Sequence, residues 1–179
     1  MGYTHYFYRA KKDFDQTTWN VFISECKKMV KALPKTIDGE PLVLTGCSRY
    51  KIPLFNKDQV YFNGGSGAPR TRDTSGTYYS TDNTNLGHET FSIQRKYTKG
   101  AFDNSSDSMQ FDCCKTARKP YDLAVMLVLM LYKYYFKDDV RVSSDGDWDG
   151  EWKIAQKYFA EMFPCKAMEL LLDGKDIFN

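Results

Sequence analysis

The chain has 179 residues, of which 42% are hydrophobic, 27% charged and 16% aromatic, with a formal net charge of +2. This composition is typical of a soluble globular protein with a single domain and a substantial core, and the small net charge does not indicate binding to polymeric nucleic acid. The longest apolar run, 123–131, is too short for a membrane span, and the first ten residues lack the apolar core of a secretory signal.

The first 40 residues predict a strand followed by a helix. Residues 1–9 alternate between two faces and are rich in aromatic side chains, which favours a strand. Asp15 is placed to cap a helix, and Phe14 and Trp19 have the spacing of a hydrophobic staple. Apolar side chains then recur at helical spacing until Pro34, which ends the predicted helix.

The middle of the chain predicts short strands and polar loops. Strand patterns are present at 41–45, 59–63 and 88–95. Residues 63–87 are rich in Gly, Ser and Thr, and such a stretch is either disordered or a loop that becomes ordered over a ligand. A second polar loop is predicted over 98–108.

The last third of the chain is predicted to be mostly helical. Pro120 suits the first turn of a helix, and 121–136 is apolar nearly all round, as in a buried central helix. A short strand is expected at 140–143, and a tail helix at 165–173 is expected to pack on the domain or on another subunit. Between them, one amphipathic helix is predicted to carry on one face Trp148, Trp152, Ala155 and Phe159.

These elements together predict one α+β domain over 1–179, with a small, mostly antiparallel sheet and about three helices packed on it. The five cysteines are odd in number and irregularly spaced, and the sequence contains no CxxC pair. Adjacent Cys113 and Cys114 rarely bond to each other, because the geometry is strained. We therefore expect free thiols in a reducing cytoplasm, with no metal and no cofactor.

The segment CKTARKPYD is the first candidate site. Lys115, Arg118 and Lys119 precede the predicted helix, although a helix N-terminus carries partial positive charge. Each cation there costs roughly 0.3–1 kcal/mol unless an anion or carboxylates compensate. A bound phosphate would compensate, with Thr116 offering a hydroxyl and Tyr121 an aromatic face. The alternative is a solvated loop whose cations pair with local acids.

The segment SSDGDWDGEW resembles the first half of a calcium-binding loop. Calcium-binding loops of this type have a bidentate Glu at their twelfth position. Counted from Asp145, the twelfth position here is Gln156. A turn followed by a helix capped by Asp147 is therefore the better interpretation. Ser144 and Asp145, at the end of the predicted strand, remain candidates for contact with a ligand.

Four further groups of residues are candidates. Asn63 suits a tight turn or a ligand contact, and Glu89 beside His88 suits acid–base chemistry or a solvent-facing strand. A cysteine beside a histidine would be a nucleophile, but the sequence does not place them together. In the Gly-rich stretch, two arginines would close on phosphates or keep the loop soluble: Arg70 and Arg72.

Five segments occur in the same order in a family of short, mostly uncharacterised proteins of bacteriophages and prophages: MGYTHYF, YFNG, HETF, CKTARKPYD and SSDGDW. The chain resembles this family over most of its length, and differs in the Gly-rich insertion after Asn63 and the extension after Pro164. The resemblance implies a phage counter-defence protein that sequesters a cyclic dinucleotide immune signal in the infected cell (an anti-CBASS sponge). It also implies a homo-oligomer with sites between subunits.

The leading hypothesis is therefore a protein that binds a phosphorylated nucleotide without cleaving it. The phosphate ligands would be Lys115, Arg118 and Lys119. The residues that stack on a base would be Tyr6, Tyr121 and Trp148. The residues that form hydrogen bonds with the polar edges of the ligand would be Thr116, Asn63, Glu89, Ser144 and Asp145. The alternatives are an enzyme acting on a nucleotide or nucleoside, with Glu89, His88, Asp145 or Cys114 at work, and a protein–protein inhibitor.

Overall fold

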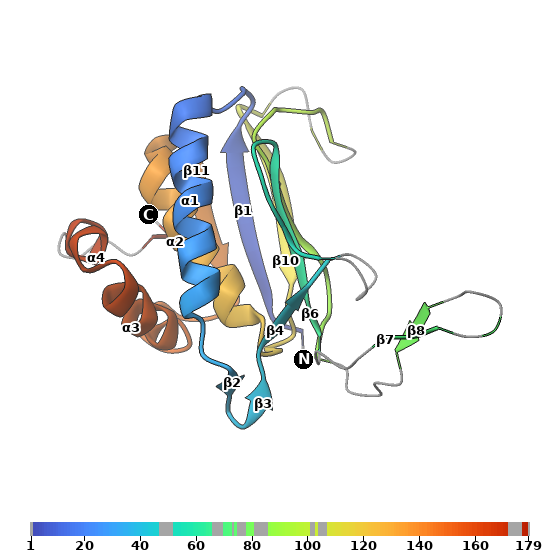
Figure 1. The fold of residues 1–179 in the computed structure, drawn as a ribbon. Coiled ribbons are helices and arrows are strands. Elements are labelled where there is room, and N and C mark those ends of the chain that lie inside the picture. Colours follow the sequence, from blue (N-terminus) through green and yellow to red (C-terminus); the bar gives the residue numbers. More distant parts are fainter. Residues whose placement is uncertain are drawn as a thin grey trace.

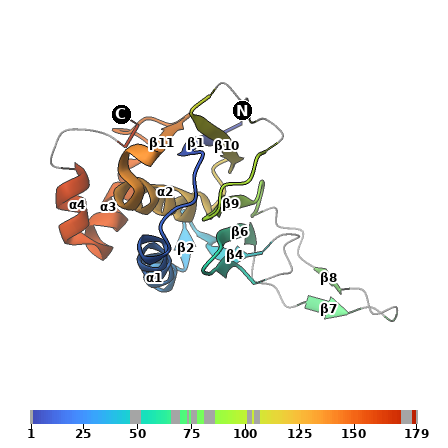
Figure 2. The ribbon, with the colours of Figure 1, turned by 90° about the horizontal axis from the view of Figure 1, so that it is seen from above.

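The computed structural model describes residues 2–46, 52–65, 70–72, 74, 78–80, 86–100, 103, 107–171 and 177–178. The chain has an α+β fold with antiparallel sheets (Figure 1). The described residues form four α-helices, one more than the number expected from the sequence. The helices lie together on one side of the sheet that contains the first strand (Figures 1 and 2).

The first helix, α1 (Gln16–Ala32), begins as predicted. The Asp15 carboxylate accepts a hydrogen bond from the Thr18 backbone N–H at 2.8 Å, which satisfies one free donor of the first turn. The Phe14 and Trp19 rings stack with their centroids 6.2 Å apart, so the hydrophobic staple is also confirmed. The helix ends at Ala32, just before Pro34.

The main sheet has the strand order β10 (Met109–Lys115), β1 (Thr4–Ala10) and β11 (Val140–Ser144), and both pairings are antiparallel. The predicted alternation of β1 is confirmed, because its inward side chains are buried and its outward ones are half-buried. β10 was not predicted as a strand. The face of this sheet that carries Tyr6 and Tyr8 is called the outer face below, and no described helix lies on that side (Figure 2).

A second sheet is built around β6 (Gln59–Gly65). Its partners are β9 (Phe91–Gln94), β4 (Val43–Thr45) and β5 (Leu54–Phe55), all antiparallel. β9 is shorter than the strand predicted over 88–95, because residues 88–90 are held by contacts with Asn63 instead of by a strand ladder.

Two small hairpins complete the strands. β2 (Thr36–Ile37) pairs with β3 (Glu40–Pro41), so Pro41 belongs to this hairpin and not to β4. β7 (Arg70–Arg72) pairs with β8 (Tyr78–Ser80) inside the predicted Gly-rich loop, and this hairpin lies apart from both sheets (Figure 1). Much of the predicted loops at 63–87 and 98–108 lies outside the described residues, as do Cys47 and residues 172–173 of the predicted tail helix.

The core is centred on α2 (Asp122–Phe136), which is buried nearly all round as predicted. It lies between the main sheet, α1 and α3 (Lys153–Met162), as Figure 2 shows. It begins at Asp122, after a turn that contains Pro120, and a 3-10 turn (Lys137–Asp139) connects it to β11. No helix in the described part of the chain is both long and apolar enough to cross a bilayer.

The C-terminal helices differ from the prediction at their starts. α3 begins at Lys153, so Trp148 lies in the turn before the helix and not on its face. Its N-cap residue is Trp152, without a side-chain cap, so the predicted Asp147 cap is wrong. The tail helix, α4 (Pro164–Leu171), is present and packs against α3.

Candidate functional site

The N-terminus of α2 holds a carboxylate of the chain itself. Asp122, in the first turn, is 9% exposed, and its Oδ1 atom accepts a hydrogen bond from the Thr116 hydroxyl at 2.5 Å. The same oxygen lies 2.7 Å from Nε2 of the His5 ring. A carboxylate in the first turn complements the helix dipole. The anion that we expected at this helix end is therefore Asp122, and no external phosphate is needed there.

His5 connects the start of α2 to the end of β11. Its Nδ1 atom lies 3.0 Å from the Ser144 hydroxyl, which accepts a hydrogen bond from the Gly146 N–H. The order hydroxyl, imidazole, carboxylate is the order found in serine hydrolases. Here the imidazole is fully buried and the hydroxyl is already held by a backbone donor. We therefore interpret His5 and Ser144 as parts of a buried structural network.

Three of the predicted ligand contacts are structural residues. Tyr121 has no exposed ring surface, and its hydroxyl donates to the Glu89 carbonyl oxygen at 2.7 Å, so its ring does not offer the expected stacking face. Thr116 is fully buried with its hydroxyl on Asp122. The Asn63 amide donates to the His88 carbonyl oxygen at 3.0 Å and accepts from the Gly64 N–H at 2.7 Å. These contacts leave no exposed group for a ligand.

The turn between β10 and α2 has a strained backbone. Ala117 and Arg118 both have positive φ angles, 53° and 55°, which cost roughly 1–2 kcal/mol each for residues other than glycine. The turn places the Arg118 guanidinium 4.2 Å from the centroid of the Tyr3 ring and 3.1 Å from a carboxylate oxygen of Glu151. Arg118 thus pairs with an acid of the chain, as the alternative interpretation of this segment expected.

Lys115 is the last residue of β10, at one end of the outer face. Its backbone N–H donates to the Glu89 carboxylate at 2.6 Å, and its side chain lies against Gly2, where an added Cβ would come within 2.6 Å of the Lys115 Cε atom. Within the described ranges, neither Lys115 nor Lys119 forms an ion pair with a carboxylate. Two ammonium groups are therefore free to meet an external anion.

Tyr6 and Asp145 lie at the same end of this face. The Tyr6 hydroxyl donates to Asp145 Oδ1 at 3.0 Å, and the Thr4 N–H donates to Oδ2 of the same carboxylate at 2.9 Å. The hydrogen bond to Asp145 raises the pKa of Tyr6, so its hydroxyl stays protonated. Thr4 pairs with Lys115 across the strands. We call Tyr6, Glu89, Lys115 and Asp145 the polar rim.

Ser144 and Trp148 belong to a different, shallow depression beside α3. It is lined by Ser144, Asp147, Trp148, Asp149 and Phe178, among others. The Trp148 ring is half-buried and contacts the Trp152 and Phe178 rings, so it serves packing at least in part. The described wall has two carboxylates and no Lys or Arg side chain, which disfavours a phosphate. The described residues contain no cluster of three or more His, Cys, Asp or Glu side chains suited to a metal ion.

Among the described residues, a cysteine and a histidine face each other inside the core. Cys114 pairs with His5 across β10 and β1, and both are fully buried. The Cys114 thiol lies 3.6 Å from the Glu89 carbonyl oxygen, and burial raises its pKa far above the usual range. A thiol in this state is not a nucleophile. The pair therefore packs the core and carries no chemistry.

This burial makes the thiol reactivity predictable. We expect iodoacetamide at neutral pH to alkylate Cys165 and Cys113, which are exposed, and to leave Cys114 and Cys26 unmodified until the chain is unfolded. Burial, together with nearby Glu89, raises the pKa of Cys113, so its alkylation should keep accelerating above the pH range of an ordinary thiol. Peptide mapping by mass spectrometry measures each site, and rapid native alkylation of Cys114 would contradict this account of the core.

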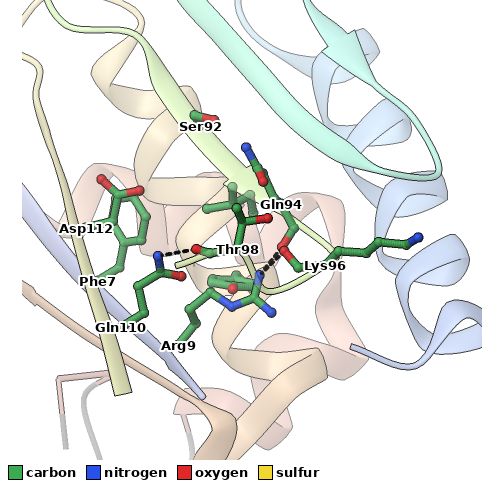
Figure 3. A pocket seen from close by; sticks show the side chains of 10 residues that line it. Phe7, Arg9, Ser92, Gln94, Lys96, Thr98, Gln110 and Asp112 are labelled. Atoms are coloured by element: carbon green, nitrogen blue, oxygen red, sulfur yellow. Dashed lines mark hydrogen bonds between the residues drawn. The ribbon is translucent and has the colours of Figure 1, made fainter. Parts of the chain in front are cut away.

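A small cavity lies between the two sheets, where β9 faces β1 and β10 (Figure 3). Its volume is about 70 Å³, and its wall includes Asp112, Gln110 and Tyr132. Burial raises the pKa of Asp112, and the buried Tyr132 hydroxyl has no hydrogen-bond partner in the described part of the protein. One water needs roughly 10–15 Å³. The cavity is therefore large enough for a few waters but too small for a nucleotide.

The structure thus brings together only part of the predicted set. Tyr6 contacts Asp145, and Glu89 contacts the Lys115 backbone; Thr4 lies between these two pairs, because its N–H donates to Asp145 and it pairs with Lys115 across the strands. The turn that carries Arg118 and Lys119 follows Lys115 directly in the chain. Sequence reasoning missed the role of His5, although the alternation puts it on the same face of the strand as Phe7, and the structure shows that this face is buried. Comparisons with protein-family models, with curated proteins and with solved structures found no match.

Proposed function

We propose that the polar rim binds a phosphorylated nucleotide and holds it without cleaving it. The observation that supports this most is that a half-exposed aromatic ring, two carboxylates and an unpaired ammonium group all lie at one end of the main sheet, in two contact pairs on either side of Thr4. These groups come from β1, β10, the segment before β9 and the end of β11. An aromatic ring, hydrogen-bond acceptors and a cation are the groups that a nucleotide requires.

Each group of the rim has a defined role in this proposal. The ammonium groups of Lys115 and Lys119 bind phosphate oxygens. The Arg118 guanidinium also binds phosphate, because its ion pair with Glu151 is exposed and therefore weak. The Tyr6 ring stacks on a base. The carboxylates of Asp145 and Glu89 accept hydrogen bonds from N–H groups of that base.

The proposed biological role is the sequestration of a cyclic dinucleotide immune signal during phage infection. The sequence resemblance to phage and prophage proteins supports this role, and the rim supplies suitable chemistry. Sponges of this type act as symmetric homo-oligomers, and we propose the same here. The exposed Met168 on α4 is a candidate contact between subunits, and sedimentation of the whole protein tests that arrangement.

Substituting Lys115 by alanine should weaken nucleotide binding by about 10- to 100-fold, because one charge-assisted contact to phosphate is lost. Isothermal titration calorimetry with a panel of mono- and cyclic dinucleotides measures this effect. Lys27, an exposed lysine on α1, provides the matched control, and Lys27→Ala should bind like the unmodified protein.

Two results would count against the proposal. If no nucleotide of the panel binds, the ligand class is wrong. If the bound molecule is recovered chemically altered after the protein is denatured, the rim is a catalytic site, and His88 beside Glu89 is then the pair to substitute first. Recovery of intact ligand is the expected outcome.

A further inference from the structure

We infer that the ligand extends from the polar rim along the outer face of the main sheet, and that it carries two bases. This inference rests on the proposed function and deepens it. It arises from the side chains that the strand register places beside the rim, most of which the sequence analysis did not select: Tyr8, Met109, Phe111, Cys113 and Arg141.

The outer face is an ordered array of side chains on three strands. In β1, successive outward positions are Thr4, Tyr6 and Tyr8, and in the register Tyr8 lies between Phe111 of β10 and Arg141 of β11. Side chains two residues apart on a strand project from the same face about 7 Å apart. The two tyrosines therefore form consecutive aromatic positions, and only the first belongs to the rim.

Phe111 connects the two tyrosines. Its ring centroid lies 5.3 Å from that of Tyr8 and 6.3 Å from that of Tyr6, and the Tyr6 and Phe111 planes are only 24° apart. Phe111 is 38% exposed although it is a large apolar residue on a strand. Aromatic side chains on an open antiparallel sheet are a recurrent platform for unstacked bases. The aromatic surface is thus continuous from the rim to the middle of the sheet.

Each end of this aromatic surface has a cation. Lys115 lies opposite Thr4, and the Arg141 guanidinium lies 5.5 Å from the centroid of the Tyr8 ring. Thr4 and Tyr8 are separated by four residues of β1, which is about 13 Å along a strand. A mononucleotide has one base and occupies one aromatic position. A ligand that uses both cations and both positions carries two bases with phosphate groups beside them.

The exposed surface favours a nucleotide over a protein partner. The exposed large aliphatic and aromatic residues of the described chain are scattered, and Phe111 is the one on this face. A stable protein interface needs roughly 800 Å² from each partner with an apolar centre. The outer face has alternating rings and cations instead, which suits planar bases joined by phosphates.

The test compares three probes on one protein: a mononucleotide, a linear dinucleotide and a cyclic dinucleotide, each titrated by calorimetry. Both dinucleotides should bind about 5- to 150-fold more tightly than the mononucleotide, which is the effect of stacking one further base. Phe111→Leu should remove most of that advantage, so that the ratio of dinucleotide to mononucleotide affinity falls toward one. Leu54→Ala, on a strand of the other sheet with 39% exposure, is the matched control and should change neither.

Equal affinity for all three probes would overturn the two-base inference and the proposed cyclic-dinucleotide role, and would leave standing the proposal that the rim binds a phosphorylated nucleotide. Absence of binding by every probe would overturn both. A dinucleotide advantage that survives Phe111→Leu would also contradict the inference, because the second base would then lie elsewhere. A preference for the cyclic dinucleotide indicates a free signal molecule as the ligand. A preference for the linear dinucleotide indicates a segment of single-stranded nucleic acid. If the dinucleotide advantage is lost in Phe111→Leu, either preference supports the inference that two bases bind on the outer face.

Discussion

Replacing His5 by alanine is expected to lower the free energy of unfolding by about 3 kcal/mol or more, because the buried Asp122 carboxylate loses its imidazole partner and keeps only the Thr116 hydroxyl among the side-chain contacts described above. The His5 ring is fully buried and lies 2.7 Å from Asp122 and 3.0 Å from Ser144. Its edge contacts with Tyr3 and Trp152, at centroid distances of 5.1 and 5.2 Å, are lost as well. Urea denaturation followed by circular dichroism measures the change.

The chain offers a matched control for this substitution. His88, the second histidine, is exposed, and His88→Ala should change the free energy of unfolding by less than about 0.5 kcal/mol. A partial test of the same network is Thr116→Val, which removes one hydroxyl donor to Asp122 and should cost about 1–2 kcal/mol. Equal stability of the two alanine variants would show that the His5 contacts contribute little.

The network also fixes the geometry of the proposed site. Ser144 holds the Gly146 N–H, and the residue between them, Asp145, is the carboxylate that binds Tyr6. Loss of His5 should therefore disturb the turn that carries Asp145, even though His5 itself contacts no ligand in the proposal. A buried network thus positions one side of an exposed rim.

The elements that follow a local pattern were predictable from the sequence. The alternation of residues 1–9 identified β1 and its two faces, and the apolar spacing, the Asp15 cap and the Phe14–Trp19 staple identified α1. The apolar character of α2 also indicated its central position. In each case neighbouring residues satisfy the same physical requirement, so a short window of sequence contains the necessary information.

β10 was missed because its alternation is the reverse of the usual one. Its inward side chains include Gln110 and Asp112, which face the polar cavity between the sheets. Its outward side chains include Phe111, which is exposed. A prediction that looks for strands with apolar inward side chains therefore does not recognise residues 109–115 as a strand. The reversed pattern agrees with the ligand surface inferred for the outer face.

The roles of the cations were not predictable from local sequence either. The Glu89 carboxylate that binds the Lys115 backbone lies 26 positions away in the chain, and Glu151, which pairs with Arg118, lies 33 positions away. Asp122 lies close to these cations in the sequence, but its burial with His5 depends on a strand 117 positions away. Pairings of this kind are determined by tertiary structure, and sequence spacing does not contain them.

Replacing Arg9 by methionine is expected to lower the free energy of unfolding by about 3 kcal/mol, since several carbonyl oxygens lose a charged donor at once. Arg9 is only 8% exposed, and its guanidinium donates to five carbonyl oxygens, those of Ala10, Lys12, Gln94, Arg95 and Lys96. It also lies 4.3 Å from the centroid of the Phe14 ring. Arg9 therefore joins the end of β1 to the end of β9 beside the cavity in Figure 3.

The planar fork of Arg9, and not only its charge, should matter. Arg9→Lys keeps the charge but has three donors without the planar fork. It should therefore lower the free energy of unfolding by more than half as much as Arg9→Met does. Arg141→Met, the same change at an exposed position, should alter stability by less than about 0.5 kcal/mol. Denaturant midpoints of the three variants decide the matter: if Arg9→Lys is as stable as the unmodified protein, charge alone holds the two sheets together at this end.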